Sequence, residues 1–291
     1  MSAVLVREVG PLALVEDLGR PGHAALGVTR SGAADRRALR LANRLVGNDE
    51  AAPAVEVLLG GLVLRAEGRV TIAVTGAPAP LSLKGSAVQL CSPLDLRDGD
   101  ELRLGMPRTG LRTYVAVRGG LAVEQLFGSA STDPTSGLGP QRLEAGTRLG
   151  IGVAPAFAAT GVDVLGASSP PLGDLVLRAV AGPRADWFTA AANAALAGSA
   201  WVVTSESDRV GIRLSGPHLE RSRPGELPSE GVVRGAIQVP ASGQPLIFFA
   251  DHPTTGGYPV IAVVLDEDTD ALAQSRPGDR VRFQVRRDPV W

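Results

Sequence analysis

Short apolar runs bounded by turn residues are the feature that most constrains the fold of this 291-residue chain. Most runs are rich in valine, isoleucine and leucine and end at glycine, proline or Asp-Gly, as β-strands do. Examples are residues 70–74, 114–117, 175–180 and 201–204. Two segments, 33–46 and 186–196, instead show helical spacing or alanine-rich composition before a glycine. The pattern predicts a mainly β fold with a few short helices, and not alternating βαβ units.

The length allows one large domain or two ordinary ones. A Gly-Asp turn opens an alternating strand at residues 99–104 and again at 278–283. A duplicated β domain explains this recurrence, and so does the frequency of Gly-Asp turns in any β protein. We expect an N-terminal β domain at residues 1–166 and a C-terminal β domain at 172–291, separated by the Ser- and Pro-rich segment 167–171.

Composition and charge exclude several classes of protein. The net charge of -1 gives no general attraction to nucleic acid or to an anionic membrane. The single cysteine, Cys91, excludes an intramolecular disulfide, and no apolar run reaches the ~18 residues of a membrane span. Charged residues at positions 7 and 8 interrupt any apolar region of a signal peptide, so we expect a cytoplasmic protein. The three histidines show no metal-ligand spacing, and we expect no protein metal site.

The first polar loop, residues 16–37, concentrates carboxylates, guanidinium groups and glycines ahead of the predicted helix. Ser31 and Gly32 precede that helix, whose first N–H groups and dipole suit a carboxylate or phosphate. Arg20 and Arg30 are each able to bind such an anion through two N–H groups. The alternative is structural: Ser31 caps the helix while Asp17 pairs with Arg20. Both interpretations stay open.

Two further loops offer polar groups beside predicted strands. In the second, Ser229, Glu230 and Gly231 follow a Pro-rich stretch, where a tight turn is an adequate explanation. Gln238 lies on the opposite face from its apolar neighbours, either in a site or in solvent. In the third, residues 249–259, two glycines permit close approach of a ligand to the backbone, and threonine and tyrosine supply hydroxyls. The adjacent Asp251 and His252 point oppositely in an extended segment, which is poor evidence for a catalytic pair.

Several of these phrases together resemble the KipA-like family, also called the C subunit of 5-oxoprolinase or allophanate hydrolase subunit 2. The phrases occur in order along nearly the whole chain, at residues 15–22, 31–35, 41–48, 56–61, 117–120, 128–133, 207–211, 229–231 and 254–259. The resemblance implies a fold of two cyclophilin-like β-barrel domains, related to half of the carboxyltransferase domain of urea carboxylase. One departure is that His252-Pro253 stands where relatives usually carry Arg-Gln, which replaces a long cation by an imidazole.

The resemblance also implies a partner and a reaction. Family members assemble with a KipI-like B subunit. Together with a LamB/YcsF-like A subunit, they hydrolyse 5-oxoproline to glutamate using ATP, with Mg²⁺ that a partner is able to hold. This chain would be inactive alone, and no biotin is attached to it. Two alternatives are a regulatory protein that neutralises a KipI-like kinase inhibitor, and a carboxyltransferase or amidolyase component acting on urea or allophanate.

On this basis we assign candidate roles to fourteen residues. The hypothetical proton acceptors are Asp17 and Glu230. The hypothetical substrate- or anion-binding residues are Arg20, Arg30, Ser31, Gly32, Asn43, Ser229, Gly231, Gln238, Thr255, Gly256, Gly257 and Tyr258.

Overall fold

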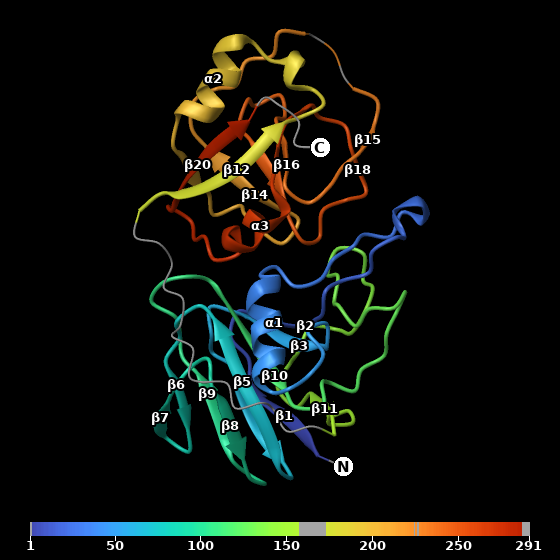
Figure 1. Ribbon diagram of the computed structural model, residues 1–291, viewed down its shortest axis with the longest axis vertical. Helices are drawn as coiled ribbons and strands as arrows, with labels where there is room; N and C mark the ends of the chain where they lie inside the picture. The colour runs from blue at the N-terminus through green and yellow to red at the C-terminus, as the bar shows by residue number, and fades with distance from the viewer. Residues whose placement is uncertain (1, 157–172, 224, 226, 287–291) are drawn as a thin grey trace. The chain divides into compact units, whose positions relative to one another are not determined.

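The computed structural model describes residues 2–156, 173–223, 225 and 227–286, and the chain separates into two compact units (Figure 1). Unit 1 comprises Met1–Arg20 and Ser31–Pro170, and unit 2 comprises Pro21–Arg30 and Pro171–Trp291. The segment 21–30 therefore belongs to unit 2, although its neighbours on both sides in the sequence belong to unit 1. The predicted boundary at residues 167–171 lies outside the described residues, so the exact domain limits stay a prediction.

Unit 1 consists of two β-sheets and one α-helix. The six-stranded sheet has the order β11-β1-β4-β9-β6-β7, and the five-stranded sheet has the order β2-β3-β10-β5-β8. Every strand pair in both sheets is antiparallel. The bounds are β1 Ala3–Glu8, β2 Leu12–Glu16, α1 Arg36–Leu45, β3 Ala54–Leu58, β4 Val63–Glu67, β5 Val70–Gly76, β6 Leu81–Leu83, β7 Ser86–Val88, β8 Pro93–Leu96, β9 Glu101–Leu104, β10 Arg112–Val117 and β11 Arg148–Gly150.

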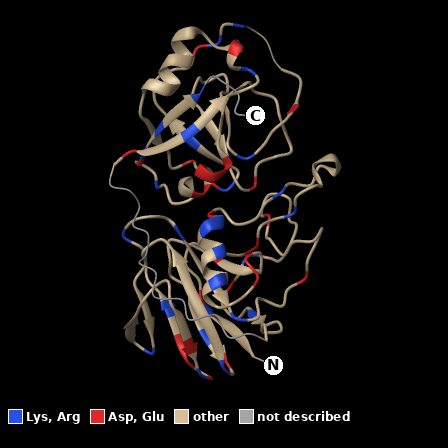
Figure 2. Ribbon diagram, viewed as in Figure 1, with Lys and Arg blue, Asp and Glu red and all other residues tan. Residues whose placement is uncertain are grey.

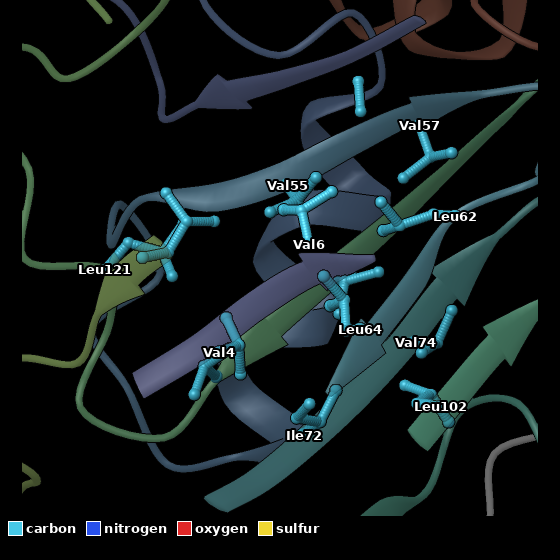
Figure 3. Close-up of a cluster of buried hydrophobic side chains, with 14 of the residues drawn as sticks. Val4, Val6, Val55, Val57, Leu62, Leu64, Ile72, Val74, Leu102 and Leu121 are labelled. Carbon is cyan, nitrogen blue, oxygen red and sulfur yellow. The ribbon is translucent and has the colours of Figure 1, made fainter. Parts of the chain in front are cut away.

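The core of unit 1 is formed by the alternating apolar residues of both sheets. Valine and leucine side chains from β1, β3, β4, β5 and β9 meet in one cluster (Figure 3). Because successive side chains of a strand point to opposite faces, the intervening residues of the five-stranded sheet face α1. Ala54, Ala73, Tyr114 and Ala116 accordingly form a second cluster with Leu39, Ala42 and Leu45 of the helix. This explains why every residue of β10 is buried.

The free edge of β2 is covered by the segment that follows β10. Thr132 N–H donates to the Val15 carbonyl at 2.9 Å, and Leu143 N–H donates to the Ala13 carbonyl at 2.9 Å. Covering an edge strand satisfies its unpaired backbone groups. It also places residues 128–133 beside the end of β2, where Asp17 and Arg20 follow.

Unit 2 is built around a closed barrel of the order β12-β19-β16-β17-β14-β13-β20. The barrel closes where β12 pairs in parallel with β20, over Leu175–Val180 and Val281–Arg286. A separate two-stranded sheet joins β15 and β18. The bounds are β12 Leu175–Ala181, α2 Ala190–Gly198, β13 Trp201–Val203, β14 Gly211–Ser215, β15 Glu230–Gly231, β16 Ala236–Gln238, β17 Leu246–Phe248, β18 Thr255–Gly256, β19 Val260–Val264, α3 Asp266–Leu272 and β20 Arg280–Arg286, with 3-10 turns at Ala24–Leu26 and Ala185–Trp187.

The mainly β fold predicted from the sequence is confirmed, and the four strand examples fall in β5, β10, β12 and β13. A closed barrel is present in unit 2, whereas the described strands of unit 1 form two sheets. The first helix spans Arg36–Leu45 and not the predicted 33–46, because Asp35 caps it and the amides of residues 33–35 donate to groups outside the helix. The second predicted helix, 186–196, is a 3-10 turn followed by α2.

Charged side chains are distributed over both units (Figure 2). The most acidic element is α3, whose first turn contains Asp266, Glu267 and Asp268. Arg178 of β12 pairs with Glu267 and Asp268 at 3.0 and 2.6 Å.

Within the described ranges, no helix is long and apolar enough to cross a membrane.

Candidate functional site

The Asp17 carboxylate fastens residues 128–133 to the end of β2. Its Oδ1 accepts hydrogen bonds from Ser129 Oγ and Ser131 Oγ at 2.6 Å and from Gly19 N at 2.7 Å, and its Oδ2 accepts one from Ala130 N at 2.7 Å. The side chain is buried. Four donors satisfy both oxygens, as a buried carboxylate requires. The arrangement suits a residue that positions a loop.

Arg20 lies deeper than the sequence suggested, with an exposed fraction of 1%. Its Nη2 donates to the Ser131 carbonyl. Its Nε and Nη1 have no hydrogen-bond partner in the described part of the chain. The predicted structural pair of Asp17 with Arg20 is not among the ion pairs of the described residues, because the Asp17 oxygens are bonded to other donors.

Ser31 and Gly32 adopt left-handed backbone conformations, with φ of 50° and 96°. Gly32 packs so closely on Gly19 that a Cβ would lie 2.7 Å from the Gly19 nitrogen, so a side chain is excluded here. Ser31 is buried, and its Oγ donates to the Thr132 carbonyl at 3.3 Å. These residues therefore join the cluster around Arg20, which we call the Arg20 cluster: Asp17, Arg20, Ser31, Gly32 and residues 128–133.

The helix cap predicted at Ser31 is wrong, because Asp35 caps α1. Asp35 Oδ1 accepts from Ala38 N at 2.9 Å. The amides just before the helix are also engaged: Ala34 N donates to Glu56 Oε2 at 2.9 Å, and Asp35 N donates to the Tyr114 hydroxyl at 2.7 Å. These amides are held by buried side chains of β3 and β10.

The side chains behind the helix start form a buried polar network. The Tyr114 hydroxyl donates to Glu56 Oε2 at 2.6 Å, and Arg112 Nε lies 3.3 Å from Glu56 Oε1. Burial, reinforced by the Glu56 charge, raises the pKa of Tyr114 well above its usual value. The phenol therefore stays protonated and acts as a fixed donor. Sequence reasoning missed this network because its members lie on different strands.

The Asn43 side chain is buried and hydrogen-bonded within unit 1. It is fully buried, its Nδ2 donates to the Ala52 carbonyl at 2.7 Å, and its Oδ1 accepts from Asn48 Nδ2 at 3.1 Å. Asn48 also donates to the Val117 carbonyl at 2.8 Å. Asn43 thus links the turn after α1 to the end of β10.

In unit 2 the structure brings two predicted loops together. Glu230 of β15 pairs with Gly256 of β18, and Gly231 pairs with Thr255. Gln238 is buried, and its Nε2 donates to the Tyr258 carbonyl at 2.9 Å. A Cβ on Gly256 would lie 2.4 Å from that nitrogen, so a side chain at this position would displace the Gln238 amide. The alternative of a solvated Gln238 is therefore wrong.

Two arginines that sequence reasoning did not select complete this group. Arg184 pairs with Glu230 through two contacts, Nη2 with Oε1 and Nε with Oε2, the latter at 3.1 Å. The hydrogen bond from Arg184 lowers the pKa of Glu230 below its ordinary value. The Arg221 guanidinium lies 6.0 Å from the centroid of the Tyr258 ring, which is half exposed. We call Arg184, Arg221, Glu230, Gln238 and residues 255–258 the Glu230 cluster.

The remaining predicted residues lie on the surface of unit 2. Ser229 and Gly257 are exposed, next to the Glu230 cluster in sequence. Arg30 is exposed and ends the 21–30 segment of unit 2, whereas Arg20 belongs to unit 1. The roles assigned from the sequence to these and the other candidate residues remain predictions.

Asp251 and His252 do not form a catalytic pair with each other. Asp251 is buried and makes a two-pronged pair with Arg209, at 2.6 Å to Nε and 2.9 Å to Nη2. His252 Nδ1 lies 2.7 Å from the Pro253 carbonyl, and burial lowers its pKa. No group of three or more histidine, cysteine, aspartate or glutamate side chains able to hold a metal ion occurs in the parts of the chain that are described.

The sequence is similar to those of proteins named as 5-oxoprolinase C subunits and as urea amidolyases. A family model described as carboxyltransferase domain, subdomain A and B, matches residues 26–285. The C subunit of 5-oxoprolinase from Escherichia coli (strain K12) is 39% identical over 279 residues, covering 94% of this chain and 88% of that protein. The protein of the same name from Haemophilus influenzae is 36% identical, covering 96% and 90%. The urea amidolyase of Lachancea kluyveri is 30% identical, over 96% of this chain and 16% of that protein.

Solved structures agree with these matches. A crystal structure of TTHA0988 superposes with a TM-score of 0.88 at 36% identity, over 98% of this chain and 55% of that one. The crystal structure of the K. lactis urea amidolyase gives 0.89 at 29% identity, over 97% of this chain and 18% of that one. This chain thus spans only part of either protein. Matched along almost its whole length, the chain belongs to the carboxyltransferase family of subdomains A and B, together with the 5-oxoprolinase C subunits.

Proposed function

We propose that this chain is the C subunit of an ATP-dependent 5-oxoprolinase that hydrolyses 5-oxoproline to glutamate and is inactive alone. The observation that carries the proposal is the match to two proteins named as the C subunit of 5-oxoprolinase, over 88% and 90% of their lengths. A component designated C implies further components. We assign these to a KipI-like B subunit together with a LamB/YcsF-like A subunit.

The longer solved relative supports a close association with a partner. This chain covers 98% of its own length but only 55% of the TTHA0988 chain. The remainder of TTHA0988 is therefore joined covalently to the part that corresponds to this protein. Our proposal is that a separate B subunit takes the place of that remainder and completes the site in a hetero-oligomer.

ATP and Mg²⁺ fit the partner better than the described residues of this chain. Mg²⁺ binds through one or two carboxylates and substrate phosphates. The described ranges contain no cluster of three potential metal-ligating side chains, and the sequence has no P-loop. We therefore assign ATP with Mg²⁺ chiefly to a partner subunit. When bound, ATP would supply the activation that a stable ring amide needs.

The two candidate proton acceptors take different roles in this proposal. Asp17 receives four hydrogen bonds and positions residues 128–133. Glu230 is half-buried, and its Arg184 partner keeps it ionised at neutral pH, since that contact lowers its pKa. We assign to Glu230 the acceptance of a proton from the water that adds to the ring carbonyl, while the C–N bond breaks and the ring nitrogen takes up a proton. The lowered pKa makes it a weak base.

Carboxyl transfer to urea is the second candidate, and the urea amidolyase match at 30% identity favours it. The two functions differ in substrate. Reconstitution with the KipI-like and LamB/YcsF-like subunits should give ATP-dependent glutamate release from 5-oxoproline and none when any one of the three proteins is omitted. ATP-dependent consumption of urea in place of 5-oxoproline would establish the second candidate. A stable complex with the KipI-like protein that turns over neither substrate would favour the regulatory alternative.

A further inference from the structure

Arg221 differs from two neighbouring arginines of unit 2 in having no carboxylate partner among the described residues. Arg184 pairs with Glu230, and Arg223 pairs with Asp186 at 2.6 Å. Within the described ranges Arg221 forms no ion pair, and its one hydrogen bond goes to a neutral backbone carbonyl. The two neighbouring guanidinium groups are thus neutralised by carboxylates of the same unit, whereas the charge of Arg221 is left without a direct partner.

The three arginines are neighbours because two segments of the chain run side by side. Phe188 forms an antiparallel bridge with Arg221, and Ser222 N–H donates to the Trp187 carbonyl at 2.8 Å. Residues 184–188 therefore lie alongside residues 221–223. Glu220 precedes Arg221 and is exposed, but adjacent side chains of an extended segment point to opposite faces.

The Arg221 guanidinium retains unused donors. An arginine side chain carries five N–H groups, and among the described residues Arg221 uses one of them, from Nη2 to the Val239 carbonyl at 2.6 Å. Nε is buried and has no partner there. Whichever of its two hydrogens Nη2 uses, one edge of the guanidinium keeps two parallel N–H groups. Buried N–H groups are normally hydrogen-bonded, so an acceptor from outside the described chain is expected at this point.

Arg221 borders both a pocket and an aromatic ring. The pocket has a volume of about 340 Å³, within the range of small-molecule sites, and Ser222, Arg223 and Pro240 also line it. The ring is that of Tyr258, which is half exposed and whose centroid lies 6.0 Å from the guanidinium. Attraction between the cation and the ring favours this arrangement and places an apolar surface beside the free donors.

We propose that Arg221 binds the carboxylate of the substrate beside Tyr258. A carboxylate is planar, accepts two parallel N–H bonds and carries one negative charge, which one guanidinium balances. The methylene groups of a five-membered ring would pack on the apolar face of Tyr258. A triphosphate brings several charges, more than one unpaired guanidinium balances. The identification of the ligand rests on the proposed function, because 5-oxoproline carries one carboxylate on its ring.

Arg221 and the proposed proton acceptor are connected within unit 2. Gln238 donates to the Tyr258 carbonyl at 2.9 Å, and Gly256, two positions before Tyr258, pairs with Glu230 across the β15–β18 sheet. The carboxylate-binding residue and Glu230 therefore lie at the two ends of one short connection, residues 256–258. Binding at Arg221 would hold the substrate beside the strand that carries Glu230.

Equilibrium binding to the full chain and to the reconstituted complex tests the proposal. Calorimetry compares 5-oxoproline, its neutral carboxamide and inorganic phosphate as probes, for wild type, Arg221→Met and the control Arg213→Met, which changes an exposed arginine of the same unit. Wild type and Arg213→Met should bind 5-oxoproline about 10- to 100-fold more tightly than the carboxamide, as one charged contact provides. Arg221→Met should bind the two equally. A merely structural role would weaken the binding of both probes alike and leave their ratio unchanged.

Three results would overturn the proposal. They are an unchanged acid-to-amide preference in Arg221→Met, tighter binding of phosphate than of 5-oxoproline, and binding of none of the probes by the complex. If Arg221→Met does not fold, Arg221→Lys keeps the charge, and its preference for the acid should fall about tenfold because the two-pronged contact is lost. Failure of turnover with intact Arg221-dependent binding would contradict the proposed function and leave the carboxylate site standing.

Discussion

Hydrogen bonding at single residues distinguishes the two carboxylates of the candidate sites. Asp17 is held by four donors from residues 19 and 129–131, whereas Glu230 has one arginine partner and lies half-buried. A carboxylate bonded on all sides fixes a loop, and a carboxylate with room around it can meet a substrate. Sequence alone could not separate them because all their partners except Gly19 lie more than 40 positions away.

Asp17→Asn tests the positioning role. The side-chain NH2 group of asparagine cannot accept a hydrogen bond, so at least one of the four donors would lose its acceptor. We therefore expect the free energy of unfolding to fall by roughly 2–4 kcal/mol. Urea denaturation measures the change. Glu124→Gln, at an exposed position of unit 1, should stay within about 0.5 kcal/mol of wild type. Equal stability of the two variants would contradict the role.

His252 gives a stability that depends on pH. Burial lowers its pKa in the folded protein, and the charges of Arg234 and Arg30 also lower it, while the hydrogen bond with the Pro253 carbonyl and the charge of Asp251 oppose this shift. The unfolded chain therefore binds the proton first as the pH falls below 6.5, and the folded state loses stability from there downward. In unfolding experiments between about pH 5 and 8, His252→Gln should lose less stability on acidification than wild type. Parallel profiles would show that His252 does not control this loss.

At the scale of elements, the strands were predictable and the helix start was not. Alternating apolar residues of β5 and β10 pack on a core formed within unit 1, so their period alone indicates strands. The start of α1 instead depends on Glu56 and Tyr114, which bind the amides of Ala34 and Asp35 from other strands. The Arg20 and Glu230 clusters also depend on contacts between residues far apart in the sequence. For the same reason, the sequence did not identify Arg184 and Arg221 as members of the Glu230 cluster.

The turn at residues 131–139 offers a matched pair of glycine substitutions. Gly139 and Gly137 both have left-handed backbone, with φ of 87° and 74°. A Cβ on Gly139 would lie 2.0 Å from the Ser131 carbonyl oxygen, whereas nothing lies within 4 Å of one on Gly137. Gly137→Ala should cost about 1 kcal/mol of unfolding free energy from backbone strain, and Gly139→Ala at least about 2 kcal/mol more. Chemical denaturation compares them, and equal losses would show that the turn is not packed on the Arg20 cluster as described.

At the scale of the whole molecule, the chain is one part of longer relatives. The family model matches residues 26–285, which include most of both units, while the TTHA0988 and urea amidolyase chains continue beyond the matched region. In those relatives the part that corresponds to this chain is covalently linked to the remainder. We propose that this protein instead associates with a separate subunit. The central claim is that the chain contributes residues to the reaction and does more than recognise a partner.

One measurement tests that claim most directly: the rate of ATP-dependent glutamate release by the reconstituted complex carrying Glu230→Gln or Glu206→Gln. Glu206 is an exposed glutamate of the same unit and serves as the control. We predict that Glu230→Gln lowers kcat by about 100-fold or more, as removal of a proton acceptor does, while the KipI-like partner stays bound and Glu206→Gln keeps the wild-type rate. Equal rates for the two variants would contradict the account, as would loss of the KipI-like partner from the Glu230→Gln complex.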